Sequence, residues 1–139
     1  MLLVEIAKFL HSRGLVTFDE TGISGDCFIS VLPSAPDEVV ALYPTGGIEG
    51  DAKLGYDSPG VQIIVRGSKN PIPALSRAQA IYNALHGFGS GMFVPGGTWI
   101  VSCFGTQSGP IYLDRDQNER HEYALNFDIE IRNKNEHRE

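Results

Sequence analysis

Apolar and polar residues follow two different periods along this chain, and each period predicts a different element. In residues 2–12, apolar side chains recur at i, i+3, i+4 and i+7, which predicts an amphipathic helix that Gly14 ends. A second helix is expected over 74–87, after a segment 70–73 that offers an N-cap and a first-turn proline. Its buried stripe is expected to consist of Leu75, Ala78, Ile81, Tyr82 and Leu85.

Strands account for the rest of the predicted regular structure. The segment 121–132 is the clearest, because apolar residues alternate strictly with polar ones, which puts one face on the core and the other in water or on a partner. Its neighbours are rich in β-formers and are bounded by proline or glycine. They are expected at 26–32, 38–43, 61–66, 98–104 and 110–113.

The order of these elements indicates the fold class. Two helices cannot supply the crossovers of an all-parallel sheet, so the sequence predicts an α+β fold. We expect a mostly antiparallel, mixed sheet of about five to six strands, with short hairpin links and both helices packed on one face. Residues 1–133 form a single domain in this interpretation, and 134–139 form a polar tail that frays.

Composition narrows the classes of function. The chain has 139 residues, of which 11 are basic and 17 acidic, giving a net charge of −6. Stable nucleic-acid binding is therefore not expected, because it needs basic side chains to neutralise phosphates. No apolar run is long enough to span a membrane. Cys27 and Cys103 are far apart in the sequence, which favours free thiols over a single disulfide.

Motifs for chemistry are missing. The glycine-rich segment 46–55 does not match a phosphate-binding loop, and no histidine pair has the spacing of metal ligands. Asp114 and its neighbours imitate a calcium loop, but Glu119 stands where glycine is required. Cys103 lies in an apolar strand, where its thiol is inert. The sequence thus predicts no catalytic residue, no metal site, no cofactor and no enzyme.

Two segments suggest contacts with other proteins. The first, 78–113, contains no Asp, Glu, Lys or Arg. A buried helix face, a flexible loop and a central strand would explain this, and so would a subunit contact through the loop 88–99, with Met92, Phe93 and Trp99. The second is the long glycine-rich loop 44–60, a length that is typical of binding or disordered loops.

Three segments together resemble the minor capsid or tail terminator proteins of long-tailed bacteriophages. They are SPGVQIIVRG at 58–67, AQAIYNALHG at 78–87 and HEYALNFDIEIRN at 121–133, preceded by a helix of the LVEIAKFL type. The resemblance extends from residue 2 to about residue 133. It implies a non-enzymatic virion component without a cofactor. Such a protein assembles in the host cytoplasm as a ring, usually a hexamer, that ends the tail tube and joins the head connector.

Charged residues can be interpreted in the light of this role. Arg66 is expected either on the surface or in an intersubunit ion pair with an acidic residue of the long loop, such as Asp51 or Asp57. The acidic residues of the last strand could face a channel and repel DNA. These residues are Glu122, Asp128 and Glu130.

Other functions stay open at this point. A head-completion or connector protein would have the same sequence features and differ only in its place in the particle. A small-ligand-binding α+β domain would need a pocket with converging polar groups. A regulatory partner protein is a further alternative.

Overall fold

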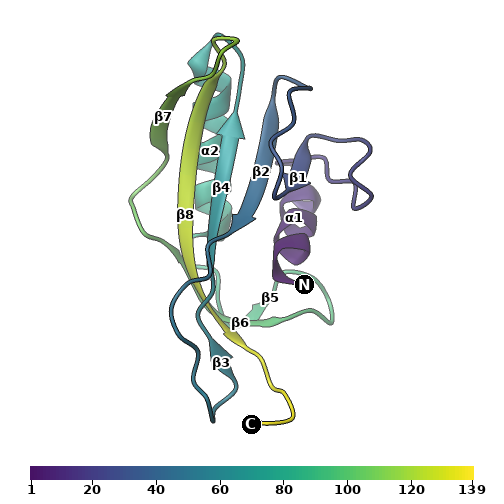
Figure 1. Ribbon diagram of the computed structural model, residues 1–139, viewed down its shortest axis with the longest axis vertical. Helices are drawn as coiled ribbons and strands as arrows, with labels where there is room; N and C mark the ends of the chain where they lie inside the picture. The colour runs from purple at the N-terminus through teal and green to yellow at the C-terminus, as the bar shows by residue number, and fades with distance from the viewer.

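The computed structural model describes all residues from Met1 to Glu139. It is an α+β fold in which two helices lie behind one curved sheet, whose longest strand, β8, runs most of the length of the molecule (Figure 1). The elements are α1 (Leu2–Ser12), β1 (Cys27–Ile29), β2 (Val39–Pro44), β3 (Tyr56–Asp57), β4 (Gly60–Arg66), α2 (Pro71–Leu85), β5 (Gly91–Met92), β6 (Trp99–Gly105), β7 (Ile111–Arg115) and β8 (His121–Arg132).

The sheet is mixed, as expected, and its strand order is β1-β2-β4-β8-β6-β5. The strands β3 and β7 also pair with β8, so β8 has two partners along each edge. There are eight strands where five to six were expected, because β3 and β5 are only two residues long and leave no period in the sequence. The hairpin expected between the first two strands is wrong, since β1 runs parallel to β2.

Both helices pack on the same face of the sheet. The fully buried side chains of β8 alternate along the strand, and they meet Ile6 and Leu10 of α1 and Ile81 and Leu85 of α2 in one core cluster. On α2, Ala74 fills the position expected for Leu75, which is 42% exposed. Close packing explains why Ala74 and not Leu75 faces the sheet. Gly67 lies so close to Ala74 that a Cβ atom on Gly67 would collide with the Ala74 side chain, so only a small residue fits at position 74.

One end of the molecule extends beyond the helices (Figure 1). We call this end the tip: residues 45–57, which include β3, together with residues 133–139. The tail does not fray as expected, because Asn133 N–H donates to Gly55 O at 2.8 Å and Glu139 N–H donates to Lys53 O at 3.1 Å. The tail therefore supports the long loop. Neither helix is long and apolar enough to cross a membrane.

Candidate interaction surfaces

The three apolar residues predicted for a contact have different positions. Met92 and Trp99 are paired across β5 and β6, and they are 42% and 45% exposed. Phe93 is 6% exposed and stacks in the core on Phe88, with ring centroids 4.4 Å apart, and against Phe9 at 5.1 Å. Met92 and Trp99 are therefore available to a partner, whereas Phe93 is a core residue.

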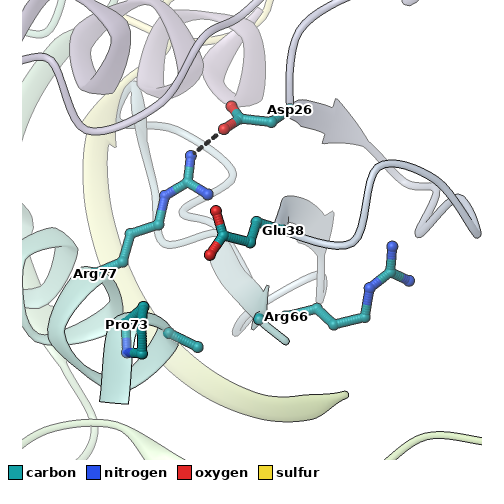
Figure 2. Close-up of a pocket in the computed structure, with 7 residues that line it drawn as sticks. Asp26, Glu38, Arg66, Pro73 and Arg77 are labelled. Atoms are coloured by element: carbon teal, nitrogen blue, oxygen red, sulfur yellow. Dashed lines mark hydrogen bonds and ion pairs between the residues drawn. The ribbon is translucent and has the colours of Figure 1, made fainter. Parts of the chain in front are cut away.

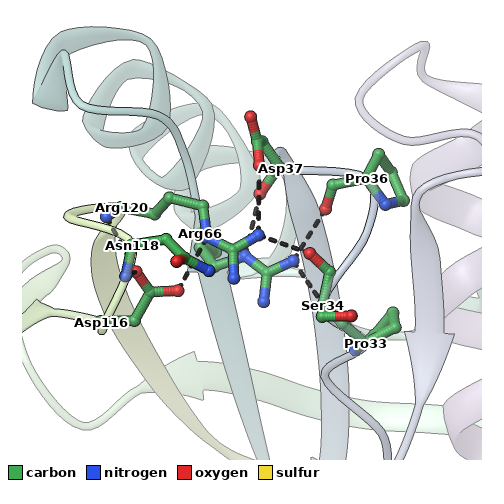
Figure 3. Close-up of polar contacts among 8 residues, drawn as sticks. All are labelled: Pro33, Ser34, Pro36, Asp37, Arg66, Asp116, Asn118 and Arg120. Atoms are coloured by element: carbon green, nitrogen blue, oxygen red, sulfur yellow. Dashed lines mark hydrogen bonds and ion pairs between the residues drawn. The ribbon is translucent and has the colours of Figure 1, made fainter.

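Arg66 is neither on the surface nor paired with the long loop. Its side chain leaves the end of β4 and is buried, with 3% of the residue exposed. The guanidinium donates from Nη2 to the carbonyl oxygens of Pro33 at 2.6 Å and Pro36 at 2.7 Å, and from Nε to Asp37 O at 2.9 Å (Figure 3). Arg66 thus holds the connection between β1 and β2 by its backbone carbonyl oxygens. Because the two strands are parallel, this connection is a crossover and not a hairpin.

A second buried arginine, which the sequence analysis missed, supports the same connection. Arg120 Nη1 donates to Ser34 O at 2.6 Å and its Nε to Asp116 Oδ2 at 2.8 Å (Figure 3). Burial and the neighbouring Arg120 charge lower the pKa of Arg66, against the opposing effect of nearby carboxylates. No sequence signal identifies Arg120, because it lies in a polar turn, and only Asp116 among its partners is near in the chain whereas Ser34 is remote.

The two aspartates of the long loop have partners inside the chain. Asp57 receives two hydrogen bonds from Arg138, at 2.7 Å to Oδ1 and 3.1 Å to Oδ2, and a third from Asn133 at 2.7 Å. Asp51 Oδ1 accepts the backbone N–H groups of Lys53 and Leu54, both at 2.7 Å. Both carboxylates are therefore engaged within their own chain, and the ion pair between Arg66 and a neighbouring subunit stays a prediction.

The Arg138–Asp57 pair gives a first prediction. We expect Arg138→Ala to release the tail from the tip, because a two-point charge-assisted contact is lost. Backbone exchange at Gly55 and Asn133 should become on the order of tenfold faster, measured by hydrogen exchange, while the protection of β8 stays the same. The control is Lys134→Ala, which removes a charge from the same exposed tail; equal exchange in both variants would contradict the role of Arg138.

The same contact predicts a pH dependence. Hydrogen bonds from Arg138 and Asn133 hold the pKa of Asp57 at about 2. Because this pKa is depressed in the folded chain, the stabilisation is complete above the ordinary aspartate pKa of about 3.9 and is lost as the pH falls through about 2. As the pH is lowered between these two values, the Gly55 amide should therefore lose its protection from hydrogen exchange. The amides of the core should lose theirs only at a lower pH.

Hollows in the surface do not have the character of an active site. One of about 200 Å³ lies beside α2 and β4, where Arg77 is already paired with Asp26 at 2.6 Å (Figure 2). Arg77 also donates to Leu15 O at 2.9 Å, so its guanidinium ties three segments together. Glu38 and Arg66 complete the charged lining (Figure 2). Both arginines are engaged within the chain, Arg77 with Asp26 and Arg66 with backbone carbonyl oxygens, which favours a structural role for them.

A groove of about 240 Å³ lies on the face of the sheet away from the helices. Exposed Ile48 and Phe104 form its apolar part, and Asp128 and Glu130 of β8 line it with carboxylates. Burial raises the pKa of Glu122, which is on the same face opposite Arg66, and the neighbouring Asp116 adds to the shift. This open face is acidic near the groove.

The cysteines are buried and free. Burial raises the pKa of both thiols, Cys27 and Cys103, to about 12. This agrees with the expectation of free thiols and of a raised pKa for Cys103 in an apolar strand. No group of three or more His, Cys, Asp or Glu residues is placed to hold a metal ion.

The strongest exposed apolar segment was not singled out from the sequence. In β7, Ile111, Tyr112 and Leu113 are 41%, 50% and 46% exposed. They belong to the charge-free stretch 78–113, which also forms β5, β6 and the second half of α2, and the charges of β7 follow them at Asp114 and Arg115. Exposure of large apolar side chains in a charge-free stretch is typical of an interface.

Comparisons with known proteins agree with this picture. A family model described as bacteriophage tail terminator protein matches residues 9–133. A solved structure described as the virion of a native gene transfer agent particle contains a chain with a TM-score of 0.60 and 15% identity, covering 91% of both chains. At this identity the likeness shows the fold. No curated protein matches the sequence significantly.

Proposed function

Since this chain belongs to the bacteriophage tail terminator family, and is therefore a structural protein of the phage tail, we propose that it assembles into a ring that ends the tail tube and joins it to the head. The ring contains copies of this chain, with six as the expected number. Its partners are the tail tube protein on one side and a head connector protein on the other. Assembly takes place in the host cytoplasm, and the finished ring remains in the virion.

The observation that carries the proposal is the asymmetry of the surface. Exposed Met92 and Trp99 and the first three side chains of β7 belong to the charge-free stretch 78–113. The region of α1 and the loop before β1 carries charges such as Lys8, Glu20 and Asp26. A ring needs two different patches on each subunit, because its contacts run head to tail. Two surfaces of unlike character on one subunit meet this requirement.

The test is the state of assembly. We expect light scattering to show a multimer that grows with protein concentration, and negative-stain images of the same sample to show rings with a central hole. In reactions with tail tube protein, adding this chain should stop tube growth, so tubes assembled without it should be longer. A chain that stays monomeric alone and leaves tube length unchanged would contradict the proposal.

The acidic open face suggests which surface lines the hole. Asp128 and Glu130 lie side by side on this face, near the groove, and negative charge there would keep passing DNA from binding. We expect the double variant Asp128→Lys with Glu130→Lys to bind DNA with a Kd of about 10⁻⁴ to 10⁻⁶ M, the range of non-specific contacts. Fluorescence anisotropy with a labelled duplex measures this, and slower DNA passage should follow in particles.

The matched control is the double variant Glu136→Lys with Glu139→Lys, which makes the same change in net charge on the exposed tail instead of the open face. If both variants bind DNA equally, net charge alone explains the effect. In that case the open face has no special place in the channel.

A further inference from the structure

We propose that neighbouring copies are joined by backbone pairing: β7 of one copy adds as a strand to the 29–31 edge of the next copy. This inference rests on the proposed ring and states how its subunits meet. It follows from two free strand edges at opposite ends of one sheet.

The first edge is that of β7. Along β8, Ile129 N–H donates to Pro59 O and His121 N–H to Ser68 O, so the odd-numbered residues of β8 direct their backbone groups toward β3 and β4. The even-numbered ones face β6 and β7, as Asn126 O does when it accepts Thr106 N–H. Ile111, opposite Ala124, therefore pairs with β8. Since backbone groups alternate along a strand, the N–H and C=O of Tyr112 point outward, away from β8.

The second edge is the end of β1 at Ile29, after which Ser30, with a φ of 58°, bends the chain toward Val31. Ser30 N–H donates to Leu42 O and Val40 N–H donates to Asp26 O, which places the even-numbered residues of β1 against β2. Ile29 therefore directs its N–H and C=O outward. The loop before β1 covers only the start of this edge, where Cys27 N–H donates to Thr17 O. Beyond that point Val31 is 49% exposed.

These two edges fit each other and call for a second copy of the chain. Each is short and carries exposed apolar side chains. The 29–31 edge has no charge, and the charges of β7, Asp114 and Arg115, follow its apolar residues. Neither edge carries a lysine, a residue that often blocks edge pairing. They lie at opposite ends of the strand order, β1 at one end and β7 beyond β8. Pairing one with the other repeats the same contact at each subunit, which produces a ring if the rotation closes. The sheets of all copies would then form one continuous sheet.

The test removes a single backbone donor at each edge. In Tyr112→Pro the outward N–H is gone, but the strand can keep its shape, since proline is tolerated on an edge whose N–H faces solvent. The control Tyr112→Ala loses the same side chain and keeps the N–H. Ile29→Pro and Ile29→Ala form the corresponding pair at the other edge. Each proline variant should reduce the ring population at least about tenfold relative to its alanine control, measured by light scattering and negative-stain imaging.

A mixing experiment tests the head-to-tail direction. Tyr112→Pro retains an intact 29–31 edge and Ile29→Pro retains an intact β7 edge, so an equimolar mixture should form dimers of one copy each and no larger species. Thermal unfolding of each variant shows whether it is folded. If Ile29→Pro does not fold, Val31→Lys replaces it in the mixture, because it places a charge on the same edge.

The outcomes separate this inference from the ring itself. Rings that persist in both proline variants would overturn strand pairing and leave the proposed function standing. Dimers formed by Ile29→Pro alone, but not by Tyr112→Pro alone, would mean that β7 pairs with itself. If Tyr112→Pro forms normal rings but no longer stops tube growth, β7 binds the tail tube protein instead. A wild-type chain that forms no ring alone or on tubes would contradict the proposed function.

Discussion

Replacing Arg66 with alanine is expected to destabilise the monomer by about 1–3 kcal/mol. The variant leaves the carbonyl oxygens of Pro33, Pro36 and Asp37 without their donor in a part-buried site. A hydrogen bond to a charged group contributes about 1.5–3 kcal/mol, and a buried polar group left without a partner costs about 1–3 kcal/mol. Urea denaturation followed by circular dichroism measures the change.

Two further variants sharpen this experiment. Arg66→Lys keeps the charge but not the planar guanidinium, so its free energy of unfolding should lie between those of the wild type and of Arg66→Ala. Arg115→Ala removes an exposed arginine from the neighbouring β7, and it should change the free energy of unfolding by less than about 0.5 kcal/mol. If Arg66→Ala unfolds like wild type but forms no rings, Arg66 acts between subunits, as the sequence suggested, and the buried contacts contribute little.

Replacing Phe93 with alanine is expected to cost about 3–5 kcal/mol of stability, the usual range for a buried phenylalanine. The ring of Phe93 lies between those of Phe9 and Phe88, so its loss opens a cavity where α1 meets the segment after α2. Met92→Ala is the matched control, because it truncates the adjacent side chain, which is 42% exposed. That variant should stay within about 0.5 kcal/mol of wild type as a monomer.

The pair also separates stability from assembly. If Met92 contacts a neighbouring subunit, Met92→Ala weakens the ring without changing monomer unfolding. Phe93→Ala should lower the midpoint of unfolding whether or not rings are present. Equal stability of the two variants in denaturant would place Phe93 outside the core and contradict its packing on Phe88.

The period of apolar residues predicted an element correctly where the geometry of the backbone alone determines that period. The helix over 2–12 and the strand over 121–132 agree with α1 and β8, because periods of 3.6 and 2 residues follow from the helix and strand backbones themselves. The position of Leu75 was wrong for the opposite reason. Both Ala74 and Leu75 fit a helical stripe, and the close approach of Gly67 decided between them.

The site residues show the same division. Met92 and Trp99 lie in an uncharged stretch, which is visible in the sequence, and they are exposed in the structure. Phe93 has the same local composition and is buried. The exposure of the three apolar residues of β7 depends on the place of that strand at an edge of the sheet, and no local pattern indicates an edge.

By itself, the sequence determined the fold class, the two helices, the long amphipathic strand and the family resemblance, since all of these depend on residues close together in the chain. Only the tertiary structure decided the roles of Arg66, Asp57 and the tail. Arg66 meets carbonyl oxygens about thirty residues away, and Asp57 meets Arg138 from the other end of the chain. Whether a charged side chain is buried, paired or free depends on which distant segments fold against it. The spacing of residues along the chain does not indicate those contacts.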